Sequence, residues 1–79
     1  MNRSLRIRDT DRFEPDWVKT DAERRRWRQH FTVGLLGYCG CSSRFIADAV
    51  SLSDGRVRTI LRSEITTHIN FSAILAATR

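Results

Sequence analysis

The chain has 79 residues, of which 41% are hydrophobic and 29% are charged, with only four glycines and one proline. This composition supports one small hydrophobic core and argues against two domains and against a disordered or collagen-like chain. No apolar run approaches the length of a membrane span or of a signal-peptide core. We therefore expect a small cytoplasmic module with no membrane partner. A chain of this size leaves little material to enclose a pocket, so we expect no enzyme and no catalytic residues.

The charge balance favours an anionic partner. Fourteen Lys and Arg residues stand against nine Asp and Glu residues, which gives a formal net charge of +5, and all the cations but Lys19 are arginines. A basic protein of this kind suits nucleic acid, and guanidinium groups form bidentate contacts with phosphate and guanine. An arginine bias is equally typical of a GC-rich genome, so the charge alone does not decide the function.

Residues 1–19 are predicted to form a basic N-terminal arm, and residues 20–79 a helical domain. Within the arm, Leu5 and Ile7 alternate with Arg6 and Arg8, a pattern typical of a short strand or an extended segment. Pro15 then interrupts the chain, and the domain is expected to begin after it.

The first predicted helix begins at a capping box. Thr20 supplies the N-cap hydroxyl and Glu23 the carboxylate three residues later. A helical stripe follows, and two glycines, Gly37 and Gly40, bracket the expected helix end. The stripe consists of Trp27, Phe31, Leu35 and Tyr38. We expect Trp27 to be a core aromatic, and Trp17 as well.

The cysteines and histidines predict no metal site. Cys39 and Cys41 are one residue apart, a spacing that suits neither a disulfide framework nor a common zinc pattern, even with His30 and His68. We therefore expect no metal and no other cofactor. The two histidines are expected to be structural or exposed.

Residues 40–61 predict two short helices joined by a tight turn. Ser42 or Ser43 can cap a first helix of about eight residues, and the chain breaks at Ser51-Leu52-Ser53. Ser53 then caps a second helix, with Asp54 in its first turn. The expected core positions are Phe45, Ile46, Ala49 and Val50 in the first helix, and Val57, Ile60, Leu61 and Ile65 in the second.

This stretch resembles the tetrahelical helix-turn-helix of LuxR-type response-regulator output domains and of the promoter-reading C-terminal domain of sigma factors. The matching residues are Gly40, Ser42, Ile46, Ala47, Val50, Leu52, Ser53 and Val57. The resemblance implies that Ala47 lies where the two helices touch, that Leu52 fills the turn, and that Val57 locks the second helix onto the first. Ser51 departs from the family, which usually has a glycine there in a left-handed conformation that serine tolerates poorly, so the turn can differ slightly.

The resemblance also implies that the second helix enters the major groove of DNA. The predicted DNA-binding residues are Ser53, Asp54, Gly55, Arg56, Arg58, Thr59, Arg62 and Arg44; Ile46, Ala47, Leu52 and Val57 are the predicted structural residues. We expect sequence-specific binding of double-stranded DNA by a small transcriptional regulator encoded by a phage or another mobile element. One alternative is a basic adaptor or inhibitor, of the phage type, that binds a host or transcription-machinery protein. Another is a packaging role on nucleic acid.

After the two helices, Ile65, His68 and Ile69 continue the apolar stripe. Asn70 is expected to cap a last helix with Phe71, Ile74 and Leu75 on one side. This apolar tail either closes the core or pairs two copies, and we expect it to form a homodimer. The predicted fold is therefore an all-α helix-turn-helix bundle of three to five helices with an extended N-terminal arm.

Overall fold

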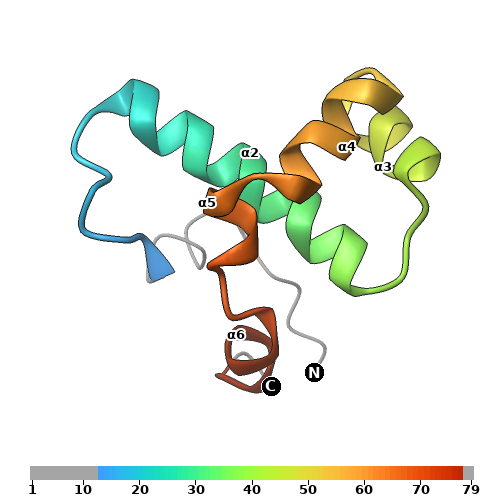
Figure 1. Ribbon diagram of the computed structural model, residues 1–79. Coiled ribbons are helices and arrows are strands. Elements are labelled where there is room, and N and C mark those ends of the chain that lie inside the picture. Colours follow the sequence, from blue (N-terminus) through green and yellow to red (C-terminus); the bar gives the residue numbers. More distant parts are fainter. Residues whose placement is uncertain (1–12, 78–79) are drawn as a thin grey trace.

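The computed structural model describes residues 13–77, and every regular element in that range is helical. Figure 1 shows the five helices as a small bundle, which confirms the predicted all-α fold class. The helices are α2 (Asp21–Tyr38), α3 (Ser43–Val50), α4 (Asp54–Arg62), α5 (Glu64–Thr67) and α6 (Phe71–Ala77). The short strand or extended segment predicted at Leu5 and Ile7 lies outside the described residues.

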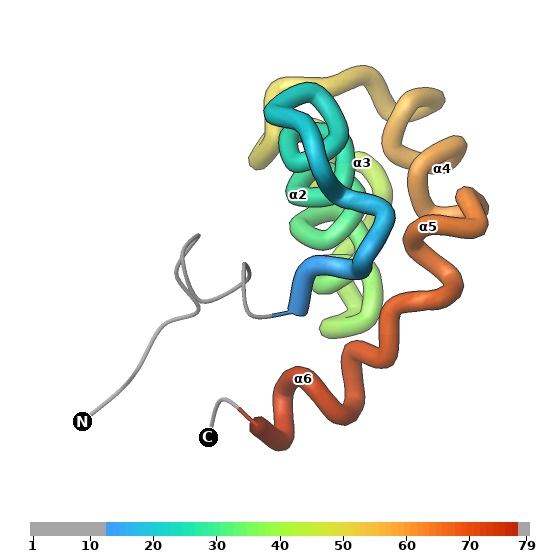
Figure 2. The backbone as a smooth tube through the Cα atoms, turned by 90° about the vertical axis from the view of Figure 1, so that its left-hand side faces the viewer, coloured from blue at the N-terminus to red at the C-terminus, as the bar shows by residue number. Residues whose placement is uncertain are grey.

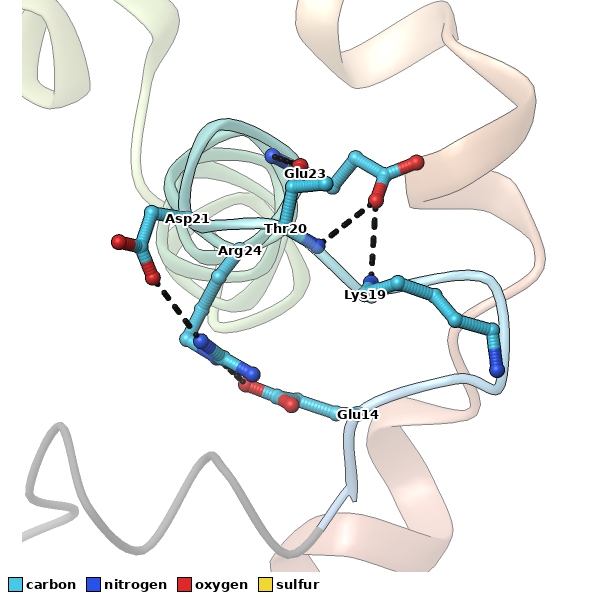
Figure 3. A network of polar contacts seen from close by, with 6 residues as sticks. All are labelled: Glu14, Lys19, Thr20, Asp21, Glu23 and Arg24. Carbon is cyan, nitrogen blue, oxygen red and sulfur yellow. Dashed lines mark hydrogen bonds and ion pairs between the residues drawn. The ribbon is translucent and has the colours of Figure 1, made fainter.

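The capping box at the start of α2 forms as predicted. Thr20 Oγ1 accepts a hydrogen bond from the Glu23 backbone N–H at 3.1 Å, and Glu23 Oε1 accepts one from the Thr20 N–H at 2.9 Å. The same carboxylate oxygen accepts a third bond, from the Lys19 N–H at 3.0 Å. Figure 3 shows these contacts at the entrance to the helix. They satisfy backbone donors that a helix start otherwise leaves open.

The segment before α2 lies against the bundle. Glu14 accepts a hydrogen bond from Arg24 Nε at 2.8 Å, and Phe13 and Val18 pack against buried aromatic residues of the core. The described part of the predicted arm therefore contributes to the same packed body as the helices that follow it.

Two clusters of buried side chains make up the core, and α2 contributes to both. The first cluster joins α2 to α3 and α4 and consists of Val33, Ile46, Ala47, Val57 and Ile60. The second joins α2 to α6 and consists of Trp27, Phe31, Phe71 and Ile74. Neighbouring rings in the second cluster are tilted, with centroids 5.1 Å apart for Trp27 and Phe31 and 5.8 Å apart for Phe31 and Phe71. Figure 2 shows α6 at the end of the molecule away from the α3–α4 connection.

Three residues predicted for the core lie at the surface. Trp17 is 40% exposed, Phe45 is 58% exposed, and Ala49 is exposed as well. On α3 the reason is geometric: the helix buries Ile46 and Ala47, with Val50 half-buried, and this choice turns the neighbouring positions 45 and 49 outward. Trp17 lies in the segment before α2 and belongs to neither core cluster.

The last part of the chain closes the second cluster. Phe71 and Ile74 are buried within the single chain, so the expectation that the tail has apolar residues to spare for a partner is wrong for these two. Asn70 caps α6 as predicted, accepting a hydrogen bond from the Ala73 N–H at 3.0 Å. Pairing of two copies stays a prediction, and it could not use Phe71 and Ile74 without unpacking the core.

The predicted continuation of the second helix to Ile65 is wrong, because α4 ends at Arg62. Ser63 takes an extended backbone and its hydroxyl accepts a hydrogen bond from the Ile65 N–H at 3.2 Å, which starts α5. The Ile60 carbonyl accepts hydrogen bonds from the Ser63 N–H at 3.1 Å and from the buried Thr66 hydroxyl at 2.6 Å, so α5 is tied to the end of α4.

Helix α2 approaches its neighbours most closely at two glycines. A Cβ atom on Gly34 would lie 2.5 Å from Phe71 Cζ and 2.7 Å from Thr66 Cγ2, and one on Gly37 would lie 2.8 Å from Leu61 Cδ2. These distances leave no room for a methyl group. By contrast, a Cβ on Gly55 of α4 would meet nothing within 4 Å.

We expect Gly34→Ala and Gly55→Ala to change stability in opposite directions. The first forces the buried Phe71 ring and Thr66 to shift, and should destabilise the fold by about 1–3 kcal/mol through overpacking. The second fills open space on a helix and should stabilise it by up to about 1 kcal/mol, the difference in helix propensity. Chemical denaturation of both variants measures the two effects. A Gly34→Ala variant as stable as the parent would mean that α2 and Phe71 are not in close contact.

The capping box also predicts a pH dependence. Hydrogen bonds from the Lys19 and Thr20 backbone lower the pKa of Glu23 from its ordinary value of 4.5. A carboxyl group whose pKa is lower in the folded state contributes stability above its unfolded pKa, and that contribution is lost as the pH falls through the folded pKa. Glu23→Gln should therefore be less stable than the parent near neutral pH, and the difference should shrink below about pH 4. Thermal unfolding of both proteins across this range tests it; a difference independent of pH would contradict it.

Candidate nucleic-acid interface

The connection between α3 and α4 is a three-residue turn with a left-handed residue. Ser51 has φ 59° and ψ 42°, and it is the one non-glycine residue with positive φ in the described range. The Ser51 and Leu52 N–H groups both donate to the Ala47 carbonyl, the latter at 3.0 Å. The turn does not differ in this respect: Ser51 takes the left-handed conformation in which the resembling families place glycine.

The turn holds the two helices against each other. Ile46 and Val57 are fully buried, Ala47 is nearly so, and Leu52 packs against the same cluster from the turn. The structure thus brings together the four residues predicted to be structural. Ser42 caps α3 by accepting from the Phe45 N–H, and Ser53 caps α4 by accepting from the Arg56 N–H, both at 3.1 Å.

The exposed residues of α4 are small or cationic, and the partly exposed carboxylate of Asp54 lies at its start. Its exposed residues are Gly55, Arg56, Arg58, Thr59 and Arg62. The Thr59 hydroxyl donates to the Gly55 carbonyl at 3.0 Å, which keeps it close to its own helix. The apolar residues Val57 and Ile60 face inward. The result is a short helix with a narrow, basic outer face, which we call the α4 face.

Asp54 differs from the other predicted DNA-binding residues because it is tied to the helix itself. Its Oδ2 atom pairs with Arg58 NH2 at 2.8 Å, and its Oδ1 atom is buried without a hydrogen-bond partner among the described residues. The ion pair is too exposed to add much stability. Its effect is to hold Arg58 near the first turn. Within residues 13–77, Arg56 and Arg62 have no such carboxylate partner.

The last predicted DNA-binding residue, Arg44, lies on another element, exposed in the first turn of α3. Next to it is the exposed Phe45, which sequence reasoning assigned to the core. The exposure of Phe45 follows from which side of α3 faces α2. The sequence does not show that side, since an eight-residue helix has too few turns to define its own apolar stripe.

The cysteines and histidines are dispersed. Cys39 is exposed and Cys41 is half-buried, and both are free thiols. The buried His30 donates from Nδ1 to the Arg26 carbonyl at 2.8 Å, and the exposed His68 donates in the same way to the Glu64 carbonyl at 2.7 Å. Among the described residues, no three side chains of the types that ligate metals come together. None of the helices that the structure describes is long and apolar enough to cross a bilayer.

Comparison with protein-family models, with curated proteins and with solved structures finds no match for this chain. A proposal for the function therefore depends on the residues of this chain, above all on those of the α4 face.

The left-handed residue in the turn gives a prediction about stability. A left-handed conformation costs a residue with a Cβ roughly 1–2 kcal/mol relative to glycine. Ser51→Gly should therefore raise the free energy of unfolding by about 1 kcal/mol, less the entropy that glycine gains in the unfolded chain. Ser51→Ala, which removes the hydroxyl and keeps the Cβ, serves as the control and should bring no gain. Urea unfolding of the three proteins decides, and a destabilised Ser51→Gly would show that the turn is not left-handed in solution.

Proposed function

We propose that the protein binds double-stranded DNA by inserting the α4 face into the major groove. The observation that carries this proposal is the composition of that face, where every exposed residue is glycine, threonine or arginine. This surface has no exposed apolar side chain, and Gly55 leaves the backbone bare in the first turn, so the helix can approach the floor of the groove. Its guanidinium groups can contact phosphates or the acceptor edge of guanine.

The three arginines of the α4 face differ in their ion pairing, and we expect them to make different contacts with DNA. Arg56 and Arg62 have no ion-pair partner in the described range, so their guanidinium groups can meet phosphate or bases without breaking an existing pair. Arg58 is held by Asp54, and its orientation is therefore restricted before DNA arrives. A charged group that is already oriented loses less rotational freedom on binding, so Arg58 is the better candidate for a contact that depends on geometry.

The resemblance of residues 40–61 to LuxR-type and sigma-factor domains supports the same proposal and extends it to transcriptional regulation in the cytoplasm. One helix-turn-helix contacts few base pairs, and regulators of this kind commonly pair two copies on a near-palindromic site. A homodimer on DNA therefore belongs to the proposal.

The proposal is tested with two double variants that remove the same charge. Arg56→Ala with Arg62→Ala alters the α4 face, whereas Arg25→Ala with Arg26→Ala removes two exposed arginines near the start of α2. Each lowers the net charge from +5 to +3. We expect the parent to bind a duplex pool at about 50 mM salt, with an affinity that falls steeply as salt rises. The α4 variant should lose at least about tenfold in affinity and flatten the salt dependence by about two contacts.

The matched variant should bind within about threefold of the parent, because its arginines lie away from the α4 face. Equal losses in both variants would show that only net charge matters, which would favour the packaging alternative. Absence of any parent complex at about 10 μM protein would overturn DNA binding.

One observation favours the second candidate function, binding to another protein. Phe45 is 58% exposed on the helix next to α4, and exposed aromatic residues are typical of protein interfaces. If the parent protein fails to bind DNA, Phe45 and Arg44 mark the surface on which a protein partner should be sought.

A further inference from the structure

A groove of about 780 Å³ lies outside the α4 face, and none of the described residues that line it belongs to α4. Its walls are the segment before α2, helix α5 and helix α6, and Trp27 of α2 contributes from within. Figures 1 and 2 show α6 well separated from the α3–α4 turn. The groove is mainly apolar, with Phe13, Trp17, Ile65 and Ile69 among its lining residues.

The lining of the groove does not share the basic character of the chain. None of the described residues that line it is a lysine or an arginine, although the chain has fourteen of these residues. Glu64 contributes a carboxylate to the lining, and the exposed Asp16 lies directly beside Trp17. An occupant that is both apolar and basic would complement this surface.

The first twelve residues of the chain have this composition. They contain four arginines and two aspartates, and Leu5 and Ile7 are separated by one residue, so both side chains point the same way when the backbone is extended. The segment also ends at the groove, because the next residue, Phe13, is part of the lining.

The segment is long enough to reach groove residues near its attachment point at Phe13. Ile7 lies six positions before Phe13, and an extended chain covers about 20 Å over that length. Covalent attachment also gives the segment an effective concentration of order millimolar at the groove, which a separate partner would have to exceed.

We propose that residues 1–12 bind in this groove of their own chain, with Leu5 and Ile7 covering the exposed part of Trp17. The bound segment would complete the second core cluster and leave the α4 face uncovered. This inference does not rest on DNA binding, and its test does not involve DNA.

Quenching of tryptophan fluorescence by acrylamide reports on the groove. Trp17 is 40% exposed and Trp27 only 2% exposed, so Trp17 should account for nearly all of the quenching. Trp17→Phe verifies this assignment, since it should abolish most of the accessible signal. The measurement compares the full-length parent with Leu5→Asp/Ile7→Asp.

We expect the quenching constant to rise by about twofold in this variant, because the indole loses its apolar cover. The matched control is Ser4→Asp/Thr10→Asp, which changes the charge of the same segment equally and keeps both apolar residues. It should quench like the parent, and circular dichroism should show that all the variants remain folded.

Three results would overturn the proposal. Equal quenching in the parent and in Leu5→Asp/Ile7→Asp would mean that Leu5 and Ile7 do not cover Trp17. An equal rise in the control would assign the change to charge. A parent whose quenching falls between about 1 and 100 μM protein would show that a second copy covers the groove instead.

Discussion

The close contact of α2 with the helices on both sides of it is the constraint on which the rest of the structure depends. α2 is the longest of the described helices, and its buried residues are shared between two clusters that do not have another helix in common. Gly34 and Gly37 allow Phe71, Thr66 and Leu61 to approach the α2 backbone to distances that a methyl group would prevent. Because α4 and α6 are each placed by α2, the orientation of the α4 face is set by the same contacts that bury the core.

This dependence explains which parts of the fold could be predicted from the sequence. Capping is a local interaction, and Thr20, Ser42, Ser53 and Asn70 each accept the backbone bond that their position predicts. Local patterns also located the turn between α3 and α4. These features depend on residues within four positions of one another, so the sequence alone contains the information.

The errors arise where tertiary contacts decide. Phe45 was assigned to the core because an eight-residue helix offers two plausible apolar sides, and contact with α2 and α4 selects the side with Ile46 and Ala47. Likewise, Phe71 and Ile74 looked dispensable for a small core, but the rings of Trp27 and Phe31 require partners on that side of α2. For the candidate site, the outward arginines of α4 followed from helical spacing. The pairing of Asp54 with Arg58 did not, because it depends on side-chain conformation.

Gly55 connects the stability of the fold with the proposed function. Its Cβ would meet no atom within 4 Å and its φ is not positive, so neither packing nor backbone conformation requires a glycine there. A glycine in a helix has a propensity cost of up to about 1 kcal/mol relative to alanine, and nothing in the described structure offsets that cost. The residue lies in the first turn of α4, between the Ser53 cap and Arg56, where a bare backbone lets a ligand come nearest to the helix. If α4 enters the major groove, as proposed, a phosphate or a base edge can approach the helix backbone at Gly55 without a side chain between them. A glycine that the fold does not require is therefore accounted for by the proposed DNA contact.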